Sequence, residues 1–81
     1  MAEDLLGRID INPQVMLGKP VIRGTRITVE IILEQISAGS STEEILAEYP
    51  RLTREDVLAA VAYAREILST DEIIPRIHLG R

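Results

Sequence analysis

The sequence contains no cysteine, tryptophan or phenylalanine, and it has a single histidine, His78, close to the C-terminus. Without cysteine there is no disulfide framework, no thiol nucleophile and no thiolate metal site. A small hydrolase built around Lys19, Arg23 and carboxylates is disfavoured, because the residues offer no evident nucleophile and base. We therefore expect no catalytic residues, no metal and no cofactor, and a protein that acts by binding.

The sequence also has no long apolar run, and its first residues do not have the pattern of a secretory signal. No apolar segment approaches the ~20 residues that a membrane span requires, and the N-terminal residues lack the basic start of a signal peptide. We therefore expect a cytoplasmic protein with no membrane contact. A chain of 81 residues forms one domain, residues 1–81. Because so short a chain buries only ~60% of its unfolded surface, self-association as a homodimer is expected.

Charge is unevenly distributed along the chain. Between residues 8 and 26 the charged residues are Arg8, Lys19, Arg23 and Arg26, with Asp10 as the single acid. Between residues 28 and 66 eight acidic residues stand against three arginines. This separation indicates a basic N-terminal part and an acidic body that contact different partners.

The basic part, residues 8–27, has the pattern of a small β-hairpin. Polar and β-branched residues alternate from Arg8 to Ile11, which is typical of a short half-buried strand. Val21-Ile22 and Arg26-Ile27 offer partner strands, with Gly24 at the tip of the turn between them.

Residues 28–69 have the pattern of three helices. Thr28 can cap the first helix, and Gly39 follows it as a stop signal. Ser41 and Glu44 have capping-box spacing at the start of a short second helix, which Pro50 closes. The same capping pattern opens the third and longest helix at Thr53.

Apolar spacing predicts which helix faces are buried. The first helix carries one stripe, with Ile31 outside it as either a wider core or a contact with a second chain. That stripe consists of Val29, Ile32, Leu33 and Ile36. In the third helix the predicted core stripe is Val57, Val61, Ala64 and Leu68, widened by Leu58, Ala60 and Ile67. Residues 70–81 form a C-terminal tail.

This layout predicts a mainly α fold, a three-helix helix-turn-helix bundle with a small N-terminal β-hairpin. Two further runs carry a family resemblance: D-I-N-P-Q-V-M-L-G-K-P-V-I-R-G-T-R-I-T-V and I-S-A-G-S-S-T-E-E-I-L-A-E-Y-P-R-L-T-R-E-D-V-L-A-A-V-A-Y-A. They resemble the prokaryotic family labelled domain of unknown function 433, from Ile9 to about Leu68. The resemblance implies a homeodomain-like fold and the antitoxin of a type II toxin–antitoxin pair, whose toxin resembles a PIN-domain ribonuclease.

Two sets of residues are candidates for contacts. The first set would bind nucleic acid, through backbone amides and guanidinium groups around a phosphate. Its members are Lys19, Arg23, Gly24, Thr25, Arg26, Arg51, Thr53 and Arg54. The competing interpretation is structural: the hairpin arginines pair with acidic neighbours, and Glu55 and Asp56 cap the third helix and repel phosphate.

The second set lies in the tail, which is too apolar for a purely solvated extension. Its members are Ile73, Ile74, Arg76, Ile77, Leu79 and Arg81. Either the tail folds over its own core or onto a dimer mate, or it is an arm that binds the toxin, with a guanidinium delivered into an acidic metal site.

The predicted function is a non-enzymatic antitoxin that binds a PIN-like toxin and, as a further partner, operator DNA. The alternative is a protein-interaction adaptor that does not bind nucleic acid. The net charge of −4 favours this alternative modestly.

Overall fold

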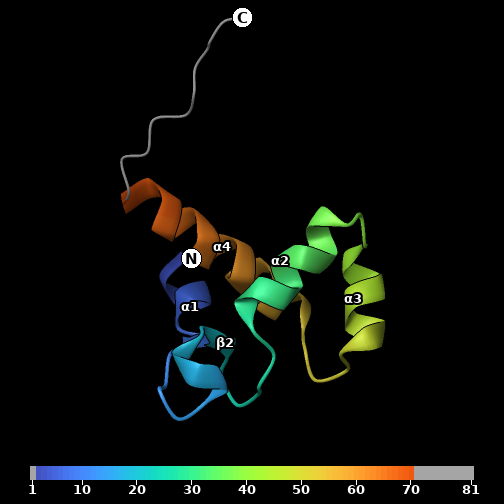
Figure 1. The fold of residues 1–81 in the computed structure, drawn as a ribbon. Helices are drawn as coiled ribbons and strands as arrows, with labels where there is room; N and C mark the ends of the chain where they lie inside the picture. The colour runs from blue at the N-terminus through green and yellow to red at the C-terminus, as the bar shows by residue number, and fades with distance from the viewer. Residues whose placement is uncertain (1, 71–81) are drawn as a thin grey trace, which may run out of the picture.

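The computed structural model describes residues 2–70 (Figure 1). Its elements, in chain order, are α1 (Ala2–Leu6), β1 (Ile9–Asp10), the 3₁₀ helix η1 (Met16–Gly18), β2 (Val21–Ile22), α2 (Val29–Ser37), α3 (Thr42–Glu48) and α4 (Arg54–Thr70). The predicted mainly α fold with a small antiparallel β element near the N-terminus is confirmed. The tail candidates Ile73, Ile74, Arg76, Ile77, Leu79 and Arg81, and also His78, lie outside the described residues.

Local capping sets where α2 and α3 begin. The Thr28 hydroxyl accepts a hydrogen bond from the Ile31 amide at 3.1 Å, which satisfies a free donor of the first turn of α2. Ser41 and Glu44 form the predicted capping box, with distances of 2.7 and 3.1 Å. Gly39, which follows α2, has φ 96°, a conformation that glycine adopts without steric cost.

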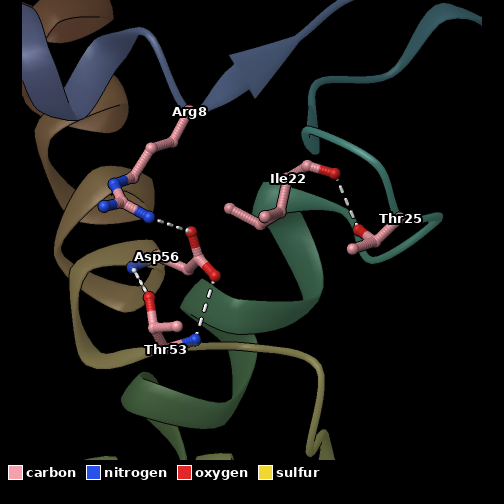
Figure 2. Close-up of polar contacts among 5 residues, drawn as sticks. All are labelled: Arg8, Ile22, Thr25, Thr53 and Asp56. Atoms are coloured by element: carbon pink, nitrogen blue, oxygen red, sulfur yellow. Dashed lines mark hydrogen bonds and ion pairs between the residues drawn. The ribbon is translucent and has the colours of Figure 1, made fainter.

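The start of α4 is capped and also tied to the N-terminal part. Asp56 Oδ2 accepts from the Thr53 amide at 2.9 Å, and the Thr53 hydroxyl accepts from the Asp56 amide at 3.2 Å. Arg8 donates from Nη1 to the other Asp56 oxygen at 3.1 Å, as Figure 2 shows. Asp56 is only 6% exposed, so its charge is buried with both oxygens engaged. The sequence predicts the cap but not the contact with Arg8.

A two-stranded sheet and a tight turn form the N-terminal β element. β1 and β2 are antiparallel, with Ile9 opposite Ile22 and Asp10 opposite Val21. On its other side β2 contacts residues 27 and 28, because the Ile22 amide donates to the Ile27 carbonyl at 2.9 Å. The predicted partner Val21-Ile22 is therefore β2 itself, and residues 27 and 28 lie on its other side. Between them Gly24 has φ 79° at the third position of a turn closed at 2.9 Å, the pattern of a type II turn.

The core lies where α4 crosses the other elements. α4 contacts α1, α2, α3 and β1, and Figure 1 shows α1 and the sheet together at one end with α3 at the other. The buried cluster consists of Ile22, Val29, Ile32, Ile45, Leu52, Val57 and Ala60. Ile31 is half-buried against this cluster, so it widens the core face of α2. The helix α1 was not predicted, and its Leu5 and Leu6 are half-buried.

The predicted core face of α4 is wrong over most of its length. Val57 is buried, but Val61 is 44% exposed and Leu68 is 65% exposed. Ala60, which the prediction includes, is fully buried, and so is Ala59, which the prediction omits. Small side chains allow neighbouring elements to approach a helix closely, so packing favours the alanine face over the face with larger apolar residues.

Replacing Asp56 by alanine should lower the free energy of unfolding by about 2 kcal/mol, because the change removes a helix cap and leaves Arg8 without its partner. Urea unfolding of the purified protein measures the loss. Glu55→Ala is the matched control, because Glu55 is an exposed acid in the same helical turn. An equal loss in both variants would show that only charge at the helix N-terminus matters, and that the Asp56 contacts do not.

Met16 and Leu17 have positive φ angles, 50° and 59°, which side chains other than glycine, asparagine and aspartate rarely adopt. Leu17 is also 93% exposed, so it has little packing to offset this strain. Leu17→Asn should therefore raise the free energy of unfolding by about 1 kcal/mol, measured by urea unfolding. A clear destabilisation would mean that the Leu17 side chain is held by contacts that its exposure does not reveal.

Candidate nucleic-acid and partner surfaces

The structure brings together only part of the predicted nucleic-acid set. Gly24, Thr25, Arg26 and Arg51 line one open depression of about 420 Å³. The other lining residues are Asp10, Asn12, Val15 and Val21. Residues from the hairpin and from the loop before α4 therefore share one surface, which we call the turn depression.

Hydrogen bonds hold the walls of the turn depression. The Thr25 hydroxyl donates to the Ile22 carbonyl at 2.7 Å (Figure 2) and accepts from the Ile27 amide at 2.9 Å. Arg51 donates from Nη2 to the Gly24 carbonyl at 2.8 Å. This last contact joins the α3–α4 loop to the hairpin. Thr25 is thus a structural member of the site, while Arg51 is exposed and has further N–H donors.

Three predicted cations have acidic partners. Lys19 pairs with Glu30 at 3.1 Å and Arg23 pairs with Asp10 at 3.5 Å, both at the surface. Arg54 pairs with Glu43. Such exposed pairs are weak, so a ligand can exchange them. These pairs are of the kind that the structural interpretation predicts, and the nucleic-acid interpretation of the same cations stays a prediction.

Arg54 and Thr53 do not line the turn depression. The hydrogen bond from Arg54 lowers the pKa of Glu43, and the same contact raises the pKa of Arg54. Both groups thus stay charged at neutral pH. Thr53 serves the α4 cap with Asp56.

The outward side of α4 forms a second surface, the outer α4 face, consisting of Leu58, Val61, Arg65 and Leu68. These positions follow one another at three- and four-residue spacing, so they share one side of the helix. Leu58 is 56% exposed. Beside this face, Pro20, Leu33, Tyr63, Ala64, Ile67 and Leu68 line an apolar depression of about 390 Å³, which Lys19, Val29 and Glu30 complete. Apolar spacing assigned Leu58, Val61 and Leu68 to the core, so this surface was not predicted. The small side chain of Ala59, next to the predicted core residue Ala60, was the signal for the buried face.

No three His, Asp or Glu side chains within residues 2–70 are grouped so that they could hold a metal ion. None of the helices in this range has the length and apolar character needed to cross a membrane.

Comparison with known proteins identifies relatives of this chain. A protein of Sinorhizobium fredii (strain NBRC 101917 / NGR234), described as uncharacterized protein y4eO, is 38% identical over 53 residues. The matched region covers 65% of this chain and 24% of that protein, so the chain spans about a quarter of the relative's length. The crystal structure of a DUF433 member protein from Anabaena variabilis ATCC 29413 is similar, with a TM-score of 0.73. It is 37% identical, and the match covers 84% of this chain and 67% of that chain.

A family model described as "Protein of unknown function (DUF433)" matches residues 9–64. This range is more than half of the chain and includes the β element, α2, α3 and the first part of α4. The chain therefore belongs to the DUF433 family.

Proposed function

We propose that the protein is a non-enzymatic antitoxin that captures a PIN-like ribonuclease toxin through the outer α4 face and contacts operator DNA through its hairpin. The proposal takes the antitoxin role from the family resemblance, and the outer α4 face is the observation that supports it. The homodimer and the cytoplasmic location belong to the same proposal.

The outer α4 face has the chemistry of a protein contact. Leu58, Val61 and Leu68 expose apolar side chains on one side of a 17-residue helix. Single exposed apolar residues are ordinary on protein surfaces, but several aligned on a rigid element are typical of a partner site. Arg65 lies among them and makes no ion pair within residues 2–70. A guanidinium at this position suits a nuclease whose metal site is built from carboxylates. We propose the tail arginines Arg76 and Arg81 as further contacts with the same acidic site.

The same face argues against α4 as a DNA-recognition helix. A recognition helix presents polar and basic side chains to base edges and phosphates. Here the outward residues are largely apolar, and Glu55 is exposed in the first turn. We therefore assign the operator contact to the hairpin, where Arg26 and Arg51 meet at the turn depression.

A second candidate function is an adaptor that binds only protein. The intramolecular partners of Lys19, Arg23 and Arg54 favour it, because those cations are already engaged by acids. Retention on a DNA column that falls as salt rises separates the two functions, since phosphate contacts release counterions.

Leu58→Asp and Val61→Asp should each abolish capture of a PIN-like ribonuclease encoded by the adjacent reading frame. Each change places a charge in an apolar contact without altering the buried face of α4. Co-expression, copurification and recovery of ribonuclease activity measure capture. Ile11→Asp is the matched control, because Ile11 is 58% exposed and lies outside α4. Unchanged capture by both α4 variants would assign the toxin contact elsewhere.

The protein should form a two-fold symmetric dimer, because so short a chain buries a small core and its sheet has only two strands. Light scattering at micromolar protein concentration measures the mass. A monomer mass that does not change with concentration would remove the dimer from the proposal. The light-scattering mass of the Leu58→Asp variant shows whether a second copy of the chain binds the outer α4 face. If this variant is still a dimer, the dimer contact lies elsewhere and the face is available for the toxin.

A further inference from the structure

We propose that the turn depression binds the phosphoryl group of a sugar phosphate, held between the guanidinium groups of Arg26 and Arg51. This proposal concerns the ligand of the turn depression alone. It rests on the proposed function only where the sugar phosphate belongs to operator DNA, and it is independent of toxin capture. A depression of about 420 Å³ is within the range of small-molecule sites.

Two guanidinium groups supply the donors. Arg51 is oriented by its hydrogen bond to the Gly24 carbonyl at 2.8 Å, which leaves its other N–H groups for a ligand. Arg26 is exposed, and its side chain makes no hydrogen bond or ion pair within residues 2–70. Planar guanidinium groups bind phosphoryl oxygens in a bidentate manner, and one that is already oriented loses less freedom on binding.

The backbone of the turn leaves room for a ligand. Gly24 has φ 79°, and a Cβ at this position would meet no atom within 4 Å. The glycine is therefore required by the backbone conformation and faces open space. Thr25 fixes the turn from the inner side, since its hydroxyl is engaged by Ile22 and Ile27. Arg26 and Arg51 thus line the depression beside a turn that is hydrogen-bonded on one side and open at Gly24.

Two other lining residues, Asp10 and Asn12, favour a sugar phosphate over bare phosphate. Asp10 carries a negative charge that opposes an anion, although Arg23 at 3.5 Å from its Oδ1 offsets part of that charge. The second Asp10 oxygen has no partner within residues 2–70, so it can accept from a sugar hydroxyl. Asn12 accepts from the Gln14 amide through its oxygen at 2.8 Å, which leaves its side-chain amide group as a further donor.

The test uses adenosine monophosphate as the probe, with adenosine and inorganic phosphate as partial ligands and a short DNA duplex as the polymeric source. Titrations followed by NMR should move the amide signals of Gly24 and Thr25 with a sugar phosphate, and only weakly with either partial ligand. Affinity for the monophosphate without affinity for DNA identifies a free nucleotide as the source. Affinity for DNA alone, sensitive to the same arginines, identifies the nucleic-acid backbone. Both results support the site.

Arg26→Gln and Arg51→Gln should each raise the dissociation constant about tenfold for whichever ligand binds, adenosine monophosphate or the DNA duplex. A tenfold change is the effect of losing one charge-assisted hydrogen bond. Arg54→Gln is the matched control, because it removes an exposed arginine that lies outside the depression. If Arg51→Gln disturbs the turn, Arg26→Gln carries the test, since the Arg26 side chain has no hydrogen bond or ion pair within residues 2–70 to lose.

Equal weakening by Arg54→Gln would show attraction by overall charge, and it would overturn the site. So would the absence of shifts at Gly24 and Thr25 with both the monophosphate and DNA at millimolar concentration. Neither result affects toxin capture, which is measured on variants of the outer α4 face, so the two proposals fail separately.

Discussion

The buried carboxylate of Asp56 is the interaction on which the arrangement of the two halves depends. It caps α4 through Thr53 and binds Arg8, which directly precedes β1. A buried charge is tolerated only where its oxygens are satisfied, so the folded state needs both contacts. The contact fixes β1 against the start of α4, and pairing with β1 in turn places β2. The turn after β2 then lies where Arg51 reaches it. The geometry of the turn depression therefore follows from a salt bridge that does not belong to it.

The two proposed surfaces differ in how they are held. The turn depression is built from a glycine turn, a threonine hydroxyl with two hydrogen bonds and a guanidinium that crosses from another loop. Its shape depends on several polar contacts and tolerates little backbone change. The outer α4 face needs only the helix, because its residues are aligned by helical periodicity on an element packed from the other side by α1 and α2. A protein with this construction can change its protein partner by surface substitution without disturbing the hairpin.

Short-range features could be predicted from the sequence, and long-range ones could not. The caps at Thr28, Ser41 and Thr53, and the turn at Gly24, involve residues a few positions apart, so residue type and spacing are sufficient. The contacts of Arg8 with Asp56 and of Arg51 with Gly24 span 48 and 27 positions. Sequence periodicity does not reveal contacts over such distances. The candidate residues could therefore be predicted one by one, but not which of them line one depression. The error at α4 has a related cause. Apolar spacing extended the core face to Val61 and Leu68, whereas the folded chain leaves those two exposed and buries Ala59 and Ala60.

Two electrostatic energies bear on the choice between a DNA-binding antitoxin and an adaptor: the strength of the ion pairs that the cations already make, and the repulsion between phosphate and the acidic body. Exposed ion pairs contribute only ~0–1 kcal/mol, so the partners of Lys19 and Arg23 are a small obstacle to a polyanion. The acidic body is the larger obstacle, because it opposes any approach of phosphate that is not directed at the hairpin. In the proposed function, DNA would approach with its phosphates toward the turn depression, where the basic side chains lie. The DNA contact would then use Arg26 and Arg51, and the toxin contact would use Leu58, Val61 and Leu68, so the two proposed contacts share no residue.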